Sequence, residues 1–170
     1  MKIPFNKRLA TAQNTVLPDG CYVGTILQIA NIGMQPGYSP ADPPTHMIAV
    51  VIQLPGLQVA KKMRLSDSPK SALFAYLDAT LPDPETYDGD DPLPLTLGRP
   101  ISVEIKVNGQ FTNVTSIRRP EAFELASAPA VAQMDCLILD DPELTSDAAK
   151  GIFLKLHRDI RGWLSKRIRG

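Results

Sequence analysis

The order of strand-like and helix-like segments restricts the possible fold more than any other feature of this sequence. Three segments rich in Ile, Val and Leu come first, at residues 20–32, 46–54 and 57–65. Such runs, bounded by turn residues, are typical of β-strands. The pair Pro55-Gly56 separates the last two segments by a turn. We therefore expect the second and third strands to form a hairpin.

A single helix is expected directly after these three strands. Ser68 is suited to the N-cap position and Pro69 to the first helical position. The apolar residues Leu73, Tyr76 and Leu77 recur at a spacing of three and four, which predicts one buried helical face.

Two further strands follow a proline-rich acidic loop at residues 80–98. Residues 99–107 alternate between apolar and polar side chains, and residues 110–119 form the second strand of the pair. Asn-Gly, at positions 108 and 109 between them, is typical of a tight hairpin turn with positive φ at both residues. Gly24, in the middle of the first strand, suggests a bulge or a sharp coil.

This element order predicts a mostly β protein, a five-stranded OB-fold Greek-key barrel with a helix between strands 3 and 4, plus a C-terminal amphipathic helix. The expected divisions are an extended arm at 1–18, the barrel at 19–119, a linker at 120–145 and a basic amphipathic helix at 146–170. The length of 170 residues suits one such domain with extensions.

Charge and composition argue against several functional classes. The formal net charge is zero, but residues 83–91 contain five acids and no base, whereas residues 150–170 contain seven Lys or Arg and one acid. A neutral total can therefore conceal a basic face. The two cysteines and two histidines lie outside any metal-ligand spacing, and no nucleophile or phosphate-loop motif occurs. We expect no catalytic residue, no metal, no cofactor and no membrane span, in a protein of the bacterial cytoplasm.

Residues suited to nucleic-acid binding occupy the positions that an OB-fold uses. Single-stranded DNA binding combines cations along the phosphates with aromatic rings that stack on bases. The candidate residues are Tyr38, Lys61, Lys62, Arg64, Lys106, Phe111, Arg118 and Arg119. Phe111 is equally compatible with the core, Tyr38 with an exposed loop, and the lysines with a solvated face.

The last helix supports a different hypothesis. Its apolar side carries Phe153, Leu156, Ile160, Trp163 and Leu164. Aromatic anchors of this kind are common in protein interfaces. An OB-fold adaptor, whose C-terminal helix docks on a partner or mediates dimerisation, is therefore the alternative to a DNA-binding protein.

Several short segments between residues 16 and 168 support the first hypothesis. They are LPDGCY at 17–22, QIANIGMQ at 28–35, PTHM at 44–47, LGRP at 97–100, NVTSI at 113–117, CLILDDP at 136–142, FLKL at 153–156 and IRGWL at 160–164. Together they resemble a family of phage-encoded OB-fold proteins that are similar to single-stranded DNA-binding proteins. The resemblance implies OB architecture, nucleic-acid binding and a phage or prophage origin. We therefore expect single-stranded DNA binding in phage or prophage replication or recombination. Replication or recombination proteins and further copies of this chain are the other partners to consider.

Overall fold

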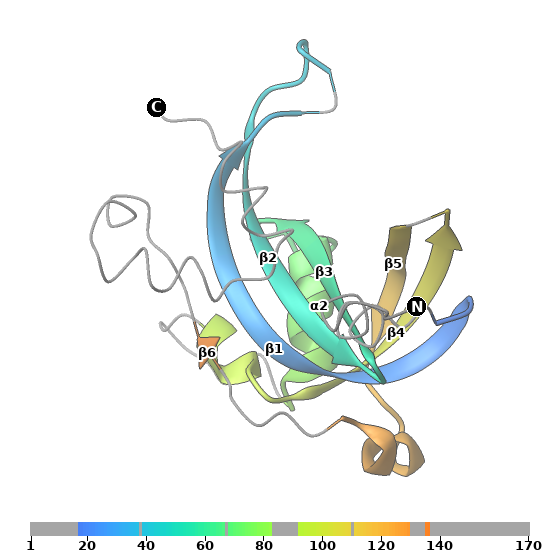
Figure 1. The fold of residues 1–170 in the computed structure, drawn as a ribbon. Coiled ribbons are helices and arrows are strands. Elements are labelled where there is room, and N and C mark those ends of the chain that lie inside the picture. The colour runs from blue at the N-terminus through green and yellow to red at the C-terminus, as the bar shows by residue number, and fades with distance from the viewer. Residues whose placement is uncertain are drawn as a thin grey trace.

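The fold is built around one long, strongly curved strand, as the computed structural model in Figure 1 shows. The structure describes residues 17–37, 39–66, 68–82, 92–109, 111–129 and 135–136. The elements are β1 (Gly20–Gln35), β2 (Thr45–Leu54), β3 (Leu57–Arg64), α2 (Ala72–Thr80), η2 (Leu93–Thr96), β4 (Pro100–Asn108), β5 (Phe111–Arg118), η3 (Ala122–Ser127) and β6 (Asp135–Cys136).

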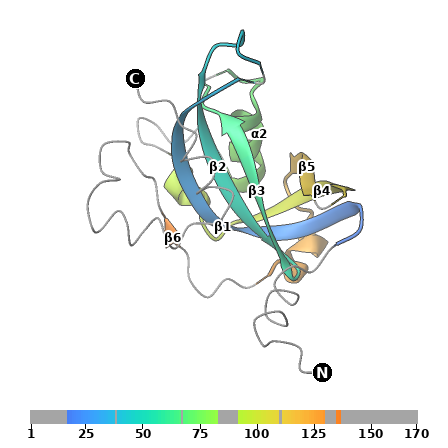
Figure 2. The ribbon, with the colours of Figure 1, turned by 45° about the horizontal axis from the view of Figure 1, so that its top comes forward.

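The five main strands form an antiparallel sheet in the order β3-β2-β1-β4-β5. The short β6 pairs with β1 in parallel, opposite Gln28 and Ile29. A mostly β architecture, the β2–β3 hairpin and a helix between the third and fourth strands are thereby confirmed. The β3 and β5 strands end this order, and the curl of the sheet turns them toward each other (Figures 1 and 2).

Strand β1 changes partners along its length. Its first part, Gly20–Thr25, pairs with β4, and from Thr25 onward it pairs with β2. The register shifts of the second pairing lie between Ile26 and Gln28 and between Asn31 and Gly33. They do not lie at Gly24, whose pairing with β4 is regular. Of the two expected alternatives at Gly24, the bulge is therefore wrong and the sharp coil stays a prediction.

Gly24 has a different role, which is to allow a close approach of β2. A Cβ at this position would lie 2.5 Å from the Ile52 Cγ2 atom, 2.8 Å from the Leu54 Cδ2 atom and 2.9 Å from the Gln53 carbonyl oxygen. Contacts below 3.0 Å require a neighbour to move. The glycine therefore lets the backbone of β1 pack closely against β2 at this position.

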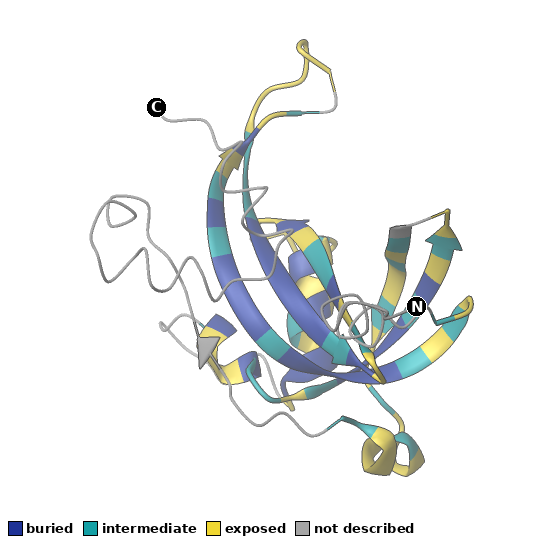
Figure 3. Ribbon diagram, in the orientation of Figure 1, coloured by how far each residue is buried: buried dark blue, intermediate teal, exposed yellow. Residues whose placement is uncertain are grey.

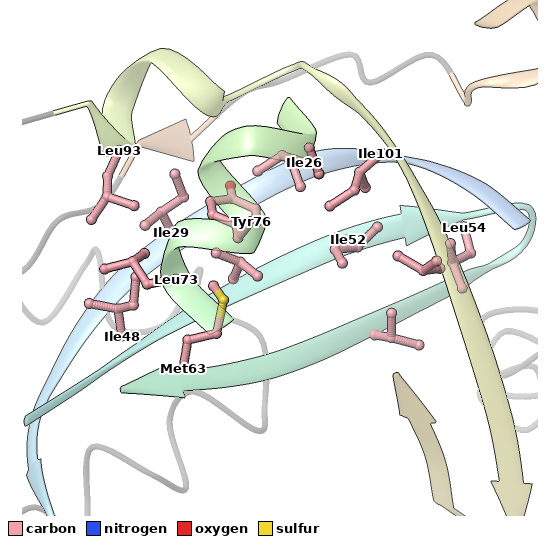
Figure 4. Close-up of a cluster of buried hydrophobic side chains, with 14 of the residues drawn as sticks. Ile26, Ile29, Ile48, Ile52, Leu54, Met63, Leu73, Tyr76, Leu93 and Ile101 are labelled. Carbon is pink, nitrogen blue, oxygen red and sulfur yellow. The ribbon is translucent and has the colours of Figure 1, made fainter. Parts of the chain in front are cut away.

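Helix α2 covers the concave side of the sheet and completes the core (Figure 4). Leu73 and Tyr76 are buried, as their spacing predicts, and contact the inward-facing residues of β1, β2 and β3. Tyr76 is fully buried, and its hydroxyl lies 2.6 Å from the Thr96 Oγ1 atom in η2. A single apolar cluster thus joins the helix to the strands.

The helix begins three residues later than the sequence suggests. The N-cap is Ser71, whose Oγ accepts a hydrogen bond from the Phe74 N–H at 3.1 Å, so the assignment to Ser68 is wrong. Ser68 instead begins a preceding turn, in which its carbonyl accepts from the Ser71 N–H. Both serines can accept from a free amide, and the sequence pattern does not separate these two uses.

The two hairpin turns differ in how closely they follow expectation. Gly56 has φ of +70°, as a Pro-Gly turn requires. Asn108, however, belongs to β4 and pairs with Phe111, and the chain turns at Gly109 with φ of +63°. Asn108 does not take positive φ, so the expected turn is shifted by one residue.

The region expected to be a linker contains η3, whose residues are mostly exposed (Figure 3). Glu121 and Glu124 form a reciprocal capping box at its start. The Thr25 hydroxyl donates to the Pro129 carbonyl at 2.6 Å and fastens the following segment to β1. Residues 1–16 of the arm expected at 1–18, and the helix expected at 146–170, lie outside the described residues. The division into domains stays a prediction.

Candidate ligand-binding groove

A groove of about 850 Å³ lies where the two ends of the sheet approach each other. One wall is formed by β3 together with the first residues of β2, and the other by residues 112–114 of β5. The end of β1 and the loop that follows it close the groove at one side. Segments from three separate parts of the chain therefore contribute to one site.

The loop after β1 is held in place by local hydrogen bonds. The Asp42 carboxylate accepts from the Ser39 N–H at 3.2 Å, and the Asp42 N–H donates to the Ser39 carbonyl at 3.0 Å. Gly37 packs closely on Asp42, so that a Cβ at Gly37 would collide with the aspartate side chain. Gly37, Asp42 and Pro43 line the groove, whereas Tyr38 lies outside the described residues.

A bulge in β1 sets the direction of this loop. The Asn31 Oδ1 atom accepts from the Gly33 N–H at 3.0 Å and lies 2.6 Å from the His46 Nε2 atom. Gly33 has φ of +70° at the register shift. His46 therefore has a structural partner in Asn31. This contact connects the start of β2 to the bulge in β1 that precedes the groove.

Three cations on β3 line the groove: Lys61, Lys62 and Arg64. Lys62 and Arg64 are exposed and lie on one face of the strand, as alternation predicts. Among the described residues, the Arg64 guanidinium makes no hydrogen bond or ion pair. The groove lining contains one carboxylate, that of Asp42, so the described lining carries a formal excess of two positive charges.

Lys61 lies on the opposite face of β3, between the buried residues Val59 and Met63. Its side chain is half-buried and spans to β5, where the ammonium donates to the Val114 carbonyl at 3.2 Å. Burial lowers the pKa of this ammonium from its usual value. Lys61 is thus a bridge between the two walls, which distinguishes it from the exposed Lys62 and Arg64.

The remaining predicted cations are not brought to the groove. Lys106 is exposed on β4 and does not belong to the lining. The Arg118 guanidinium binds the Glu124 carboxylate at 2.9 and 3.1 Å, and this hydrogen bonding lowers the pKa of Glu124. Arg119 donates to the carbonyl oxygens of Asp78 and Leu81, both at 2.6 Å, at the end of α2. Both arginines therefore have structural contacts.

The aromatic and C-terminal predictions have a different outcome. Phe111 begins β5, but its side chain is outside the described set, as are Phe153, Leu156, Ile160, Trp163 and Leu164. Their assignment to a DNA or partner site stays a prediction. Sequence reasoning missed the β5 wall, Thr112, Asn113 and Val114, although the hairpin at Gly109 places these residues next to the predicted site.

The chain matches no protein-family model, and comparison with curated proteins and with solved structures likewise finds no significant match. The resemblance to phage proteins therefore remains a hypothesis. Within the described parts of the chain there is no group of three or more His, Cys, Asp or Glu side chains placed to hold a metal ion. None of the described helices has the length and apolar character needed to cross a membrane.

Proposed function

We propose that this protein is a single-stranded DNA-binding protein with an OB-fold barrel, acting in phage or prophage replication or recombination. The observation that carries the proposal is the position of the cationic groove. In an OB-fold, nucleic acid crosses strands 2 and 3 between the loop joining strands 1 and 2 and the loop joining strands 4 and 5. Here the groove lies against β3, the β1–β2 loop and the residues after the β4–β5 turn.

The strand order is also the one that an OB barrel requires. A sheet ordered β3-β2-β1-β4-β5 closes when its two end strands, β3 and β5, meet. The hydrogen bond from Lys61 to the Val114 carbonyl joins these two strands. A helix between β3 and β4 that packs on the concave side agrees with the same architecture.

In the proposed mechanism the rim of the groove attracts the phosphates. Lys62 and Arg64 are exposed, on one face, and placed to follow a sugar–phosphate backbone along β3. The described lining contains no aromatic residue, so base stacking is assigned to the predicted pair Tyr38 and Phe111. Lys106, Arg118 and Arg119 contribute at most to the long-range field, because they lie away from the described lining.

The salt dependence follows from the number of groove cations. Each phosphate neutralised on a single strand contributes about −0.7 to the slope of log Kobs against log salt concentration. If Lys62 and Arg64 each neutralise one phosphate, they contribute about −1.4 to the slope. Through these two contacts, raising the salt from 50 to 200 mM is expected to weaken binding by about sevenfold.

The test is fluorescence anisotropy with a labelled oligonucleotide of about 30 thymidines, long enough for OB-fold site sizes. The double variant Lys62→Glu/Arg64→Glu is expected to lose at least tenfold in affinity, because two phosphate contacts become repulsive. A matched control is Lys70→Glu/Arg99→Glu, which makes the same charge change at exposed positions outside the groove lining. Equal losses of affinity in the two double variants would show that the groove is not the binding site. Duplex DNA bound as tightly as single strands would contradict the proposal of a single-stranded DNA-binding protein.

One observation favours a protein–protein adaptor as the second candidate. Phe123 in η3 is 83% exposed and Leu125 is 47% exposed, on a segment that has a capping box and the Arg118–Glu124 ion pair. Aromatic residues are common binding anchors in protein interfaces. If the adaptor hypothesis is correct, Phe123→Ser abolishes partner binding or self-association, measured by light scattering and pull-down, and leaves DNA affinity unchanged.

A further inference from the structure

Strand β2 is buried on both of its faces, although the core cluster lies on one of them. Ile48, Val50 and Ile52 point into the core beneath α2. Ala49 and Val51 alternate with them and therefore point to the opposite, outer face of the sheet, yet both are 0% exposed. Figure 3 shows this uninterrupted burial along the middle of β2. A nearly continuous apolar run of this kind is typical of a strand that is covered on both faces.

The outer face of β1 is buried next to these residues. Ala30 pairs with Ala49, and Gln28 pairs with Val51, so these four side chains share one face. Ala30 and even the polar Gln28 are buried. Ile32, at the bulge that follows, is also fully buried and lies outside the core cluster. We call Ala30, Ile32, Ala49 and Val51 the outer apolar patch.

The neighbouring strands are not sufficient to bury this patch. On β3 the residue opposite Val51 is Ala60, and a methyl group is too small to cover a valine side chain. Helix α2 packs on the concave side (Figure 4). The segment after η3 is fastened to β1 at Thr25 through Pro129, before the patch begins. The burial of the patch therefore requires a cover from outside the described residues.

The C-terminal part of the chain arrives at the edge of the patch. Strand β6 pairs with β1 opposite Gln28 and Ile29, and residues 137–170 continue from this point. The N-terminal arm enters at the opposite end of β1, where the Asp19 carboxylate accepts from the Val107 N–H. Residues that follow β6 are therefore the nearer source of a cover.

The segment at 153–164 offers an apolar surface of matching size. Its large apolar residues recur at a spacing that places them on one side of a helix. They are Phe153, Leu156, Ile160, Trp163 and Leu164. As an α-helix this segment is about 17 Å long, and the patch extends about 13 Å along β1 from Gln28 to Ile32. Most of the seven Lys or Arg of residues 150–170 lie on the other side of such a helix.

We propose that residues 146–170 dock with their apolar side on the outer apolar patch of the same chain, and that their cations extend the groove. On the outer face Lys62 lies opposite Ala49 and Arg64 lies opposite Met47, so a helix on the patch runs beside these two cations. Repulsion between exposed cations is largely screened beyond about 8 Å at physiological salt, and a bound DNA strand neutralises both sets. The docking stands on the burial of the patch, whereas the effect on DNA rests on the proposed function.

Trp163 is the one tryptophan of the chain, so its fluorescence reports on docking. In the native full-length protein we expect blue-shifted emission and protection from acrylamide quenching, relative to the urea-unfolded chain. Val51→Lys places a charge in the apolar contact and is expected to move both readings most of the way to the unfolded values. Gln58→Lys is the matched control, because it adds the same charge at an exposed position on the outer face of β3, and it should leave both readings unchanged.

Three outcomes of the fluorescence experiment would overturn the docking. The first is native wild type with the emission and quenching of the unfolded chain. The second is equal readings for Val51→Lys and Gln58→Lys when far-UV circular dichroism shows both to be folded. The third is protection of Trp163 that is lost on dilution together with a change from dimer to monomer in analytical ultracentrifugation, which would show that a second copy supplies the segment.

A milder variant tests whether this segment is the cover even if Val51→Lys does not fold. Ala49→Cys changes the patch by a single sulfur atom, and its thiol should resist maleimide in the folded chain. Adding Leu156→Asp and Ile160→Asp removes the apolar side of the segment and should make this thiol reactive, as mass spectrometry of the labelled peptides would show. Continued protection of the thiol in the triple variant would overturn the proposal.

The effect on DNA is read from the salt slope of oligo-dT binding. Lys155→Gln/Arg158→Gln neutralises two cations on the side of the segment away from its apolar residues. The slope should become less negative by about 1.4 when both contact phosphates, with the protection of Trp163 unchanged. An unchanged slope would overturn the extension of the groove. Failure of wild type to bind oligo-dT, with Trp163 still protected, would contradict the proposed function and support the docking alone.

Discussion

Replacing Gly24 by alanine tests the packing that curls the sheet and brings the groove walls together. The added Cβ would lie within 2.9 Å of two side-chain atoms and one backbone oxygen, of Ile52, Leu54 and Gln53. The backbone oxygen cannot rotate away, so we expect an overpacking cost of about 2–3 kcal/mol, at the upper end of the usual range. The lower entropy of the unfolded alanine chain offsets about 0.4–1 kcal/mol, which leaves a net loss of roughly 1–2.5 kcal/mol.

The assay is urea unfolding followed by far-UV circular dichroism. With an m-value of about 2 kcal/mol per M, the midpoint of Gly24→Ala is expected about 0.5–1.3 M below that of wild type. Gly109→Asn is the matched control. A Cβ at Gly109 meets nothing within 4 Å, and asparagine tolerates its φ of +63°, so the midpoint should hardly move. The sign decides the question, because a glycine that served only for chain flexibility would give a more stable protein on replacement by alanine.

Two further predictions concern groups outside the groove. Burial raises the pKa of Tyr76 far above its usual value of 10; above pH 10 the unfolded state loses this proton and the folded state retains it, so stability should fall as pH rises. Thermal melts between pH 8 and pH 11 should show a smaller decline for Tyr76→Phe, and identical declines would contradict the assignment. Arg119→Ala should lower stability by about 1 kcal/mol, because carbonyl oxygens at the end of α2 lose a charged donor. The DNA affinity of Arg119→Ala should stay within a factor of two of wild type. A tenfold loss of affinity would show that Arg119 contacts DNA and would contradict its purely structural role.

The sequence predicts the order of the elements well because each strand carries its own local signal. Strand β4 alternates, and Ile101, Val103 and Ile105 are all buried as expected. The Pro55-Gly56 turn needs no information from the rest of the chain. The boundaries are less accurate: β1 extends to Gln35, three residues beyond the predicted end, because its last part is held by pairing with β2 rather than by its own composition.

The errors arise where tertiary contacts decide. Ser68 and Ser71 offer the same capping chemistry, and the position of α2 on the core selects Ser71. Gly24 resembles a bulge residue in sequence, but its conformation is set by the approach of β2. Arg118 and Arg119 resemble ligand cations, and only the folded structure places Glu124 and the end of α2 within their reach. Local pattern gives the charge of a residue but not its nearest neighbour.

The groove depends on the curl of the sheet. The cations on β3 and the acceptors on β5 belong to opposite ends of the strand order, so a flat sheet would hold them several strands apart. In the folded sheet β1 passes from β4 to β2 and packs closely on β2 at Gly24, and the two end strands line the same groove. The Lys61 ammonium then donates to the Val114 carbonyl and joins β3 to β5. The exposed Lys62 and Arg64 lie on the same strand as Lys61. The positive charge of the groove therefore comes from one short segment, β3, whereas the shape of the groove depends on most of the fold.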